Sequence, residues 1–365
     1  MQTRWQDPRD GARMWLKRPA LMLMTVVLIG ALGSSLVPPT TGARRTLNIS
    51  FVDVEGGAAT LIVTPAGESV LLDAGWDGFE GRDARRIQQA GVTAIDHLVA
   101  SHYHRDHYGG VPELSRLMTI RNFYDHGPMT ALAEDPQFAA RYAAYQAAAK
   151  GRSTTLKPGD TIPLKTAAGT PSLKLLCVAA KAEVIRGKSP ANAECAGLTE
   201  PEADTSENGR SVALRLSWGG FEFLNLADLT WPISQRLVCP ANQLGELELY
   251  QVAHHGGNLS NNRPPAHPAP GGGVDDQRPA QGRHPDTIKW LREAPSFKAL
   301  YQLHRNVRTS AEQNALAEFI ANLDEQPDAA MMITVSVDAT KRTFSVTNGR
   351  TKESRDIAYV FIGGF

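Results

Sequence analysis

Cysteine is scarce in this chain of 365 residues, and its three cysteines include no CxxC pair. A structural zinc knuckle is therefore not expected. An excess of either charge is also lacking, because 38 Lys and Arg residues balance 38 Asp and Glu residues. The balanced charge does not predict a nucleic-acid-binding patch. The sequence also lacks a continuous stripe of interleaved basic and aromatic side chains. Only one long apolar run is present, so we do not expect this chain by itself to form a transport channel.

A basic lead-in precedes that apolar run at the start of the chain. The run from Ala20 to Val37 spans 18 residues, and no charged residue occurs between Pro19 and Ala43. This order is typical of an export signal or an N-terminal membrane anchor. We expect residues 1–45 to be a cleaved signal or an uncleaved anchor, and residues 46–365 to form the folded domain. That domain would then be exported, either periplasmic or extracellular, or anchored to a membrane and facing outside.

The cysteines suggest one cross-link. In an oxidising compartment cysteines pair, and Cys177 and Cys195 flank a segment without regular periodicity. We expect these two to form a disulfide, which would leave Cys239 free.

Alternating apolar and polar residues predict short strands in both halves of the chain, interrupted by helical segments. The predicted helices cover 83–90, 111–118, 136–150, 286–293 and 311–323. The predicted strands cover 47–54, 59–64, 69–73, 97–101, 120–124, 156–164, 172–178, 211–217, 221–226, 247–253, 298–303, 331–337 and 342–346. Residues 258–284 are rich in Pro, Gly and Asn and predict a flexible loop. This pattern favours an α/β fold with two mixed sheets facing each other and helices outside.

The stretch Ser101–Gly110 contains three histidines and one aspartate within six consecutive positions. His102 and His104, two residues apart, can project the same way, whereas Asp106 and His107 can face a second centre after the chain bends. Nitrogen and oxygen ligands in this combination suit zinc and similar divalent cations. The stretch therefore predicts a metal site.

Other polar side chains follow strands in the same manner. Asp73, Asp228 and the pair His254-His255 each come directly after a predicted strand. We expect one histidine of the pair to be a metal ligand. His304 also follows a strand and is expected to contact the substrate at the same edge.

The order Asp, HxHxDH, Asp and His resembles the metallo-β-lactamase superfamily, over a span from about Leu47 to the end of the chain. Within that superfamily the chain resembles the hydrolase domains of ComEC-like competence proteins. The residues that carry this resemblance are DVEGG at Asp53, LLDAGW at Leu71, SHYHRDHYGG at Ser101, NGRSVALRL at Asn208 and VAHHGG at Val252.

The resemblance implies a four-layer αββα sandwich that holds two divalent metal ions, zinc or manganese. The implied ligands are His102 and His104 at the first site, Asp106, His107 and either His254 or His255 at the second, and Asp228 bridging both. Asp73 would support the site through hydrogen bonds.

One motif departs from the superfamily pattern. A histidine that binds the first metal normally precedes the bridging aspartate, and here its place is taken by Asn208. The first site would then bind its ion more weakly, and Asn208 would be left to contact the substrate. This departure disfavours β-lactamase activity.

These features predict an exported metal-dependent hydrolase. A divalent ion lowers the pKa of a bound water towards about 7 and so supplies hydroxide at neutral pH, with Asp106 and Asp228 acting as catalytic residues through that water. Paired metal ions suit phosphodiester bonds, so the expected substrate is a phosphodiester or another small molecule. The alternatives are an ester, lactone or β-lactam hydrolase, and a non-catalytic envelope or DNA-binding module. The membrane is an expected partner if the N-terminal segment is uncleaved, and the oligomeric state stays open.

Overall fold

The computed structural model describes residues 46–199, 202–260, 272–275, 284–294, 297–324 and 330–359. All of these belong to one compact unit, Gly42–Phe365. The predicted signal or anchor at residues 1–45 and most of the predicted loop at 258–284 lie outside the described residues. In the part of the chain that is described, no helix is long and apolar enough to cross a membrane.

The first sheet is mixed. Its spatial order is β18 (Ser354–Ala358), β17 (Thr343–Asn348), β16 (Ile333–Asp338), β1 (Leu47–Phe51), β2 (Thr60–Val63), β3 (Ser69–Leu72), β4 (Ala94–Val99), β5 (Thr119–Asp125) and β6 (Ser153–Thr155). The strands from β18 to β3 are antiparallel, and those from β3 to β6 are parallel.

The second sheet is mixed as well. Its order is β15 (Ile320–Asn322), β14 (Ala299–His304), β13 (Gly272–Asp275), β12 (Leu249–Gln251), β11 (Phe221–Asn225), β10 (Ala213–Trp218), β8 (Lys174–Ala180) and β7 (Thr161–Ile162), with β9 (Glu183–Val184) paired to β8. The strands from β11 to β15 are parallel, and the others are antiparallel.

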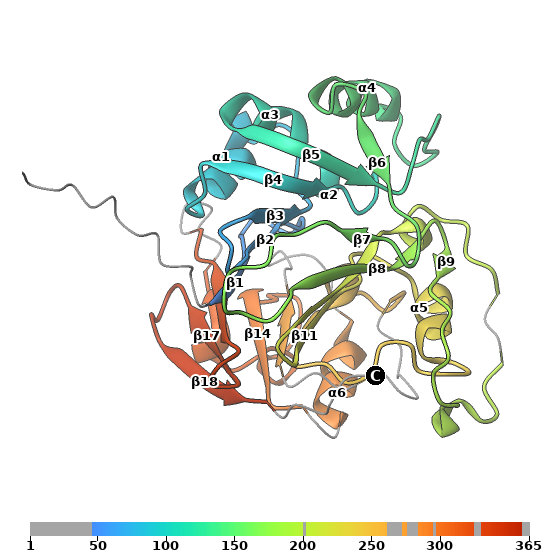
Figure 1. The fold of residues 1–365 in the computed structure, drawn as a ribbon, viewed down its shortest axis with the longest axis vertical. Helices are drawn as coiled ribbons and strands as arrows, with labels where there is room; N and C mark the ends of the chain where they lie inside the picture. The colour runs from blue at the N-terminus through green and yellow to red at the C-terminus, as the bar shows by residue number, and fades with distance from the viewer. Residues whose placement is uncertain are drawn as a thin grey trace, which may run out of the picture. The chain divides into compact units, whose positions relative to one another are not determined.

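Helices lie on the outer faces of both sheets (Figure 1). The α-helices are α1 (Arg82–Gln89), α2 (Arg105–Tyr108), α3 (Val111–Leu117), α4 (Phe138–Ala148), α5 (Trp231–Val238) and α6 (Pro285–Glu293). Short 3-10 helices are η1 (Phe79–Gly81), η2 (Ala193–Cys195), η3 (Asn208–Arg210), η4 (Ala253–Gly256), η5 (Ala311–Gln313) and η6 (Ala317–Phe319).

Period-2 alternation along the strands separates the core into layers. In β2, Ile62 packs between the two sheets, whereas its neighbour Leu61 packs under α1 and α3. In β3, Val70 and Leu71 divide in the same way. A third cluster joins the second sheet to α5 and α6. The protein is therefore a four-layer αββα sandwich, as expected from the sequence.

Three predicted elements are wrong. The helix predicted at 311–323 is replaced by η5, η6 and the edge strand β15, because Ile320 and Asn322 pair with β14 while Leu316 is exposed. Of the strand predicted at 156–164, only Thr161–Ile162 pairs with β8, because Lys157 to Asp160 form a turn. Part of the loop predicted at 258–284 is the strand β13, which lies between β12 and β14.

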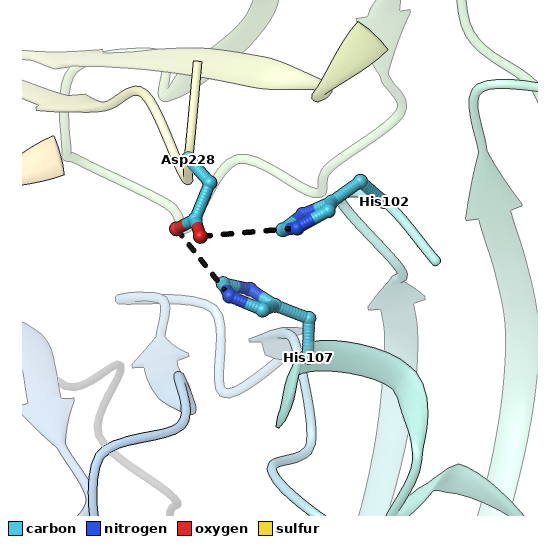
Figure 2. Close-up of side chains that lie close together, drawn as sticks. All are labelled: His102, His107 and Asp228. Carbon is cyan, nitrogen blue, oxygen red and sulfur yellow. Dashed lines mark ion pairs between the residues drawn. The ribbon is translucent and has the colours of Figure 1, made fainter. Parts of the chain in front are cut away.

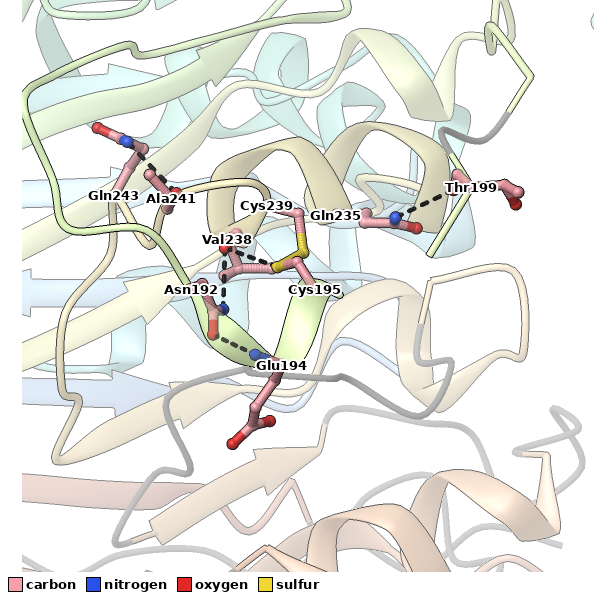
Figure 3. Close-up of a disulfide and its surroundings, with 9 residues drawn as sticks. All are labelled: Asn192, Glu194, Cys195, Thr199, Gln235, Val238, Cys239, Ala241 and Gln243. Carbon is pink, nitrogen blue, oxygen red and sulfur yellow. Dashed lines mark hydrogen bonds between the residues drawn. A yellow bond between two sulfur atoms is a disulfide. The ribbon is translucent and has the colours of Figure 1, made fainter. Parts of the chain in front are cut away.

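The predicted disulfide is also wrong: Cys195 pairs with Cys239, and Cys177 is free and buried (Figure 3). The two sides of the second sheet explain this result. Cys177 lies in β8 and points into the core between the sheets. Cys195 lies in η2, where Nδ2 of Asn192 donates to the carbonyl oxygen of Val238 at the end of α5, and the disulfide sulfur of Cys195 lies 3.5 Å from the same oxygen. A side chain on the inner face cannot reach this outer position.

Opening the Cys195–Cys239 disulfide should destabilise the fold. The cross-link spans 44 residues, and a loop of that size typically contributes about 2–4 kcal/mol by restricting the unfolded chain. We expect Cys195→Ser to lower the free energy of unfolding by about this amount in urea titrations. Reductant should destabilise the wild type equally and leave the variant unchanged. An unchanged urea midpoint in Cys195→Ser would contradict the prediction.

Glu248 should make stability depend on pH. The pKa of its carboxyl is raised from an ordinary 4.5 to about 7. Burial is the main cause, and the negative charges of Glu222 and Glu246 act in the same direction, whereas the hydrogen bond that Glu248 accepts from the backbone N–H of Glu222 opposes the rise. The folded state therefore binds this proton more tightly than the unfolded state, so stability present below pH 4.5 is lost as pH rises to about 7. We expect Glu248→Gln to melt higher than wild type at pH 8, with the two converging at pH 4 to 5. Equal melting temperatures across that whole range would refute the assignment.

Candidate metal centre

The polar residues that follow the strands converge where the two sheets meet. Asp73 follows β3, the histidine stretch follows β4, Asp228 follows β11 and His254-His255 follow β12. Each follows the carboxyl end of its strand. The backbone N–H of Val212, just before β10, donates to the carbonyl of Ser101 and ties the two sheets together at this point. The structure thus brings His107 and His255, which are 148 positions apart in the sequence, into contact.

Asp228 faces two imidazoles of the histidine stretch (Figure 2). Its Oδ1 lies 3.3 Å from Nε2 of His107, and its Oδ2 lies 3.9 Å from Nε2 of His102. Both histidine side chains are fully buried. These three residues form a group whose ligand atoms all lie within 4.8 Å of one another.

A second group of the same compactness contains Asp106, His107 and His255. Nε2 of His255 lies 3.4 Å from Oδ2 of Asp106 and 3.3 Å from Nε2 of His107. It also lies 3.7 Å from Oδ2 of Asp228. His255 is therefore the member of the histidine pair that joins Asp106 and His107.

Asp73 orients one imidazole in each group. Its Oδ2 accepts from Nδ1 of His107 at 2.8 Å and from the hydroxyl of Ser101 at 2.7 Å. The same Ser101 hydroxyl oxygen lies 3.0 Å from Nδ1 of His102 and so accepts from it. Both rings thereby present Nε2 toward Asp228, which is the nitrogen that a metal ligand in this orientation uses.

The histidine stretch and the Asp73 loop pack closely. The N–H of Ala74 donates to the carbonyl of His107, and that of Gly110 donates to the carbonyl of Gly75. A Cβ on Gly110 would lie 2.1 Å from the carbonyl oxygen of Ala74. Gly110 has an ordinary helical φ of −73°. Glycine is needed here for close approach rather than for an unusual backbone angle.

His104 and His254 lie at the margin of the site, outside the two compact groups. His104 Nδ1 is 3.1 Å from Nε2 of His102, and its Nε2 is 3.1 Å from Glu134. His254 Nε2 lies 3.7 Å from Oδ2 of Asp228 and 3.2 Å from the amide nitrogen of Asn208. Asn208 therefore enters the site beside His254.

His304 belongs to a separate cluster. Its Nε2 lies 2.8 Å from Oδ1 of Asp53, so this nitrogen is already engaged. The Arg86 guanidinium lies 3.5 Å from Asp53 and 3.3 Å from Glu55. The single Arg86 charge offsets one of the two carboxylates, and the ligand atoms of Asp53, Glu55 and His304 form a third compact group within 4.8 Å of one another, separate from the two groups around Asp228.

Glu207 is a buried residue of the site that sequence reasoning missed. Its Oε1 accepts from the backbone N–H of Tyr103 at 2.7 Å and lies 2.8 Å from Nε2 of His126. It thus holds the backbone between His102 and His104. Its position next to Asn208, where the expected motif histidine is missing, was the available signal. His126 is buried and packs against Tyr103.

The pKa values of the clustered side chains indicate that this site favours a bound cation. Burial, reinforced by His107 and His104, holds the pKa of His102 well below its usual range, so this ring is neutral and able to bind a cation. Burial acts in the same direction on His107, but Asp228, Asp106 and Asp73 outweigh it and raise its pKa well above normal. Burial would raise the pKa of Asp228, yet His107, His255 and His254 hold it well below its usual range. The carboxylates thus require positive charge, which a divalent cation can supply in place of the His107 proton.

The donor set therefore fits divalent metal ions. Imidazole nitrogens and carboxylate oxygens converge from four loops, and a transition metal or zinc prefers this combination. The buried histidines also have the oriented hydrogen bonds typical of metal ligands.

Comparison with known sequences agrees with this geometry. Residues 52–168 match the family described as the metallo-beta-lactamase superfamily. A UPF0173 metal-dependent hydrolase of Cupriavidus necator is 29% identical over 157 residues, which cover 41% of this chain and 53% of that protein. The chain thus spans about half the length of this curated relative.

Solved structures are more distant. A metal-dependent hydrolase of the beta-lactamase superfamily has a TM-score of 0.39 and 14% identity, over 70% of this chain and 95% of that one. A diphosphatase of the PhnP family has a TM-score of 0.32 and 12% identity, over 70% of this chain and 85% of that one. Structural similarity at this level does not assign a role to any residue of this chain. The family match covers the segment that contains Asp73 and the whole histidine stretch.

Proposed function

We propose that this protein is a metal-dependent hydrolase with two adjacent metal centres. One observation carries the proposal: the two oxygens of Asp228 face different imidazoles, Oδ1 toward His107 and Oδ2 toward His102 and His255. A carboxylate placed between two groups of ligands is suited to hold two cations side by side. The superfamily match and the Cupriavidus necator relative support the same reaction class.

The ligands would divide between the centres. His102, His104 and Asp228 would hold the first ion, and Asp106, His107, His255 and Asp228 would hold the second. Zinc or manganese would suit both sets of donors. When bound, paired divalent ions supply Lewis acidity and lower the pKa of a water molecule to near neutrality.

The protein side chains set up this chemistry. Asp73 keeps the Nδ1 proton on His107 and, through Ser101, on His102. Burial of His102 and His107 excludes bulk water from the inner side of the centre. The carboxylates of Asp106 and Asp228 are ionised at neutral pH, since the pKa of each is lowered by the neighbouring imidazoles despite burial.

We propose a phosphodiester as the substrate and a ComEC-like hydrolase as the nearest functional type. Two supports are the complete HxHxDH stretch and the asparagine at position 208 beside His254. Paired metal ions suit in-line displacement at phosphorus. Esters, lactones and β-lactams are the competing substrates, because the same centre can attack a carbonyl carbon.

We also propose that the protein is exported. The N-terminal segment has the composition of an export signal or anchor. The Cys195–Cys239 disulfide supports this, because disulfides persist mainly in oxidising compartments.

Metal analysis combined with a substrate panel tests the function. The purified protein would be dialysed against zinc or manganese, and the bound metal quantified by mass spectrometry. Hydrolysis would then be measured on phosphodiester, phosphomonoester, lactone and β-lactam substrates. Two ions per chain with turnover of a phosphodiester is the expected result. Bound metal without turnover of any substrate would favour a binding module, and no bound metal would overturn the proposal.

A further inference from the structure

We propose that the adjacent histidines are divided between the two centres, with His255 serving the second and His254 supplying a nitrogen ligand to the first. His254 would then replace the histidine that is missing at position 208. This inference rests on the proposed two-metal function and goes beyond it, because the sequence pattern calls for only one ligand from the pair.

The contacts of the two rings differ. Nε2 of each lies 3.7 Å from the same oxygen, Oδ2 of Asp228. His255 also faces Asp106 and His107. The ring of His254 faces Asn208 instead. His102 approaches the same Asp228 oxygen, at 3.9 Å, so this oxygen is common to all three rings and the division rests on the other neighbours of each ring.

The hydrogen bonds of His254 fix the tautomer that a ligand requires. The hydroxyl of Ser260 donates to the backbone carbonyl of Asp228 at 3.4 Å, so its oxygen is available to accept. Nδ1 of His254 lies 3.1 Å from that oxygen and therefore carries the proton. Nε2 is left with a lone pair, which points toward the Asn208 amide and Asp228. This arrangement parallels that of metal-binding histidines, which donate their second N–H to a nearby acceptor.

An unsatisfied acceptor lies beside this lone pair. The Oδ1 atom of Asn208 is buried, and among the described residues it has no hydrogen-bond partner. Leaving a buried polar atom unpaired costs free energy. A cation at the first centre would compensate this oxygen and would take the place of the Asn208 amide nitrogen, which lies 3.2 Å from Nε2 of His254.

The backbone also separates the two rings. His254 and His255 have φ values of 51° and 49°, both in the left-handed region that residues other than glycine rarely adopt. Such angles at consecutive residues persist only where the surrounding structure imposes them. The N–H of His254 donates to the carbonyl of Ala227 at 2.9 Å, which anchors this turn to the segment that carries Asp228.

Binding needs a small approach of the His254 ring. Two ligand atoms on one tetrahedral zinc ion lie about 3.3 Å apart, and Nε2 of His254 is 3.7 Å from Oδ2 of Asp228. Because the His254 side chain is partly exposed, the ring can close this gap without repacking the core.

Metal stoichiometry in single and double variants tests the division. At a zinc concentration that gives two ions per wild-type chain, His254→Ala should retain one ion, and affinity for the lost ion should fall at least about tenfold. Adding His102→Ala should remove no further ion, because both residues would serve the first centre. Adding Asp106→Ala should remove the remaining ion. His97→Gln, a buried histidine near β5, provides a matched control that should retain two ions.

The outcomes separate this inference from the proposed function. If wild type binds two ions and His254→Ala also binds two with unchanged affinity, the inference fails while the two-metal proposal stands. A raised KM in that variant would then assign His254 to the substrate. Retention of one ion in the His254→Ala/Asp106→Ala double variant would also overturn the division. If wild type itself binds no zinc or manganese, the proposed function fails first.

Discussion

Asp228→Ala is expected to abolish hydrolysis and to lower metal content from two ions per chain. Asp228 contacts both compact groups of ligands, and its pKa lies well below the usual range, so its charge is present at all working pH values. Its removal leaves the imidazoles without the carboxylate between them. We expect kcat/KM to fall by at least about 10³-fold, which exceeds the effect of losing a single stabilising hydrogen bond at an active site. The measurement is turnover of the best panel substrate together with metal content.

Two further variants make this result interpretable. Asp228→Asn keeps the shape of the side chain but removes its charge, and it should lose both metal and activity almost as completely. Asp338→Ala, at a partly exposed carboxylate at the end of β16, should behave like the wild type. Full activity of Asp228→Ala with normal metal occupancy would show that the centre has been placed wrongly.

Asp73→Asn is expected to weaken metal binding at both centres by replacing a single atom. The change is nearly isosteric, yet it replaces an oxygen by an amide nitrogen in a carboxylate that accepts from Ser101 and from His107. If the new amide nitrogen takes the place of Oδ2, it faces both Nδ1 of His107 and the Ser101 hydroxyl, so His107 must move its proton to Nε2 and the hydroxyl no longer orients His102. If it takes the place of Oδ1, it faces the backbone N–H of Ser101 and disrupts the start of the histidine stretch. We expect affinity for metal to fall about 10–100-fold, with a larger loss of turnover.

The matched variant is Ser101→Ala. It breaks the path from Asp73 to His102 but preserves the contact between Asp73 and His107. Weakened binding of one ion in Ser101→Ala, against weakened binding of two in Asp73→Asn, is the pattern expected from the hydrogen bonds. Wild-type affinity for both ions in Asp73→Asn would refute the supporting role of this carboxylate. Isothermal titration with zinc distinguishes these outcomes.

Much of the fold follows from local patterns. The alternation in Ser69–Leu72 places Val70 and Leu71 on opposite faces, and the structure packs them in different layers of the core. Elements with weaker sequence patterns were not predicted correctly. The helix Trp231–Val238 was missed although Pro232 sits at its first turn, a position that proline favours. Residues 311–323 show helical spacing, but pairing with β14 outweighs it, since tertiary contacts routinely override helix propensity.

The sequence by itself determined which chemistry is available, because HxHxDH, Asp73, Asp228 and the histidine pair each follow a strand and so supply ligands at strand ends. The tertiary structure alone decided how they are used. It set His255 against Asp106, turned His254 toward Asn208, and moved His304 into a separate cluster with Asp53. It also paired Cys195 with Cys239. The physical reason is that spacing along the sequence determines only which side chains lie near the end of the same strand. The direction of each side chain depends on backbone angles and on contacts with distant strands.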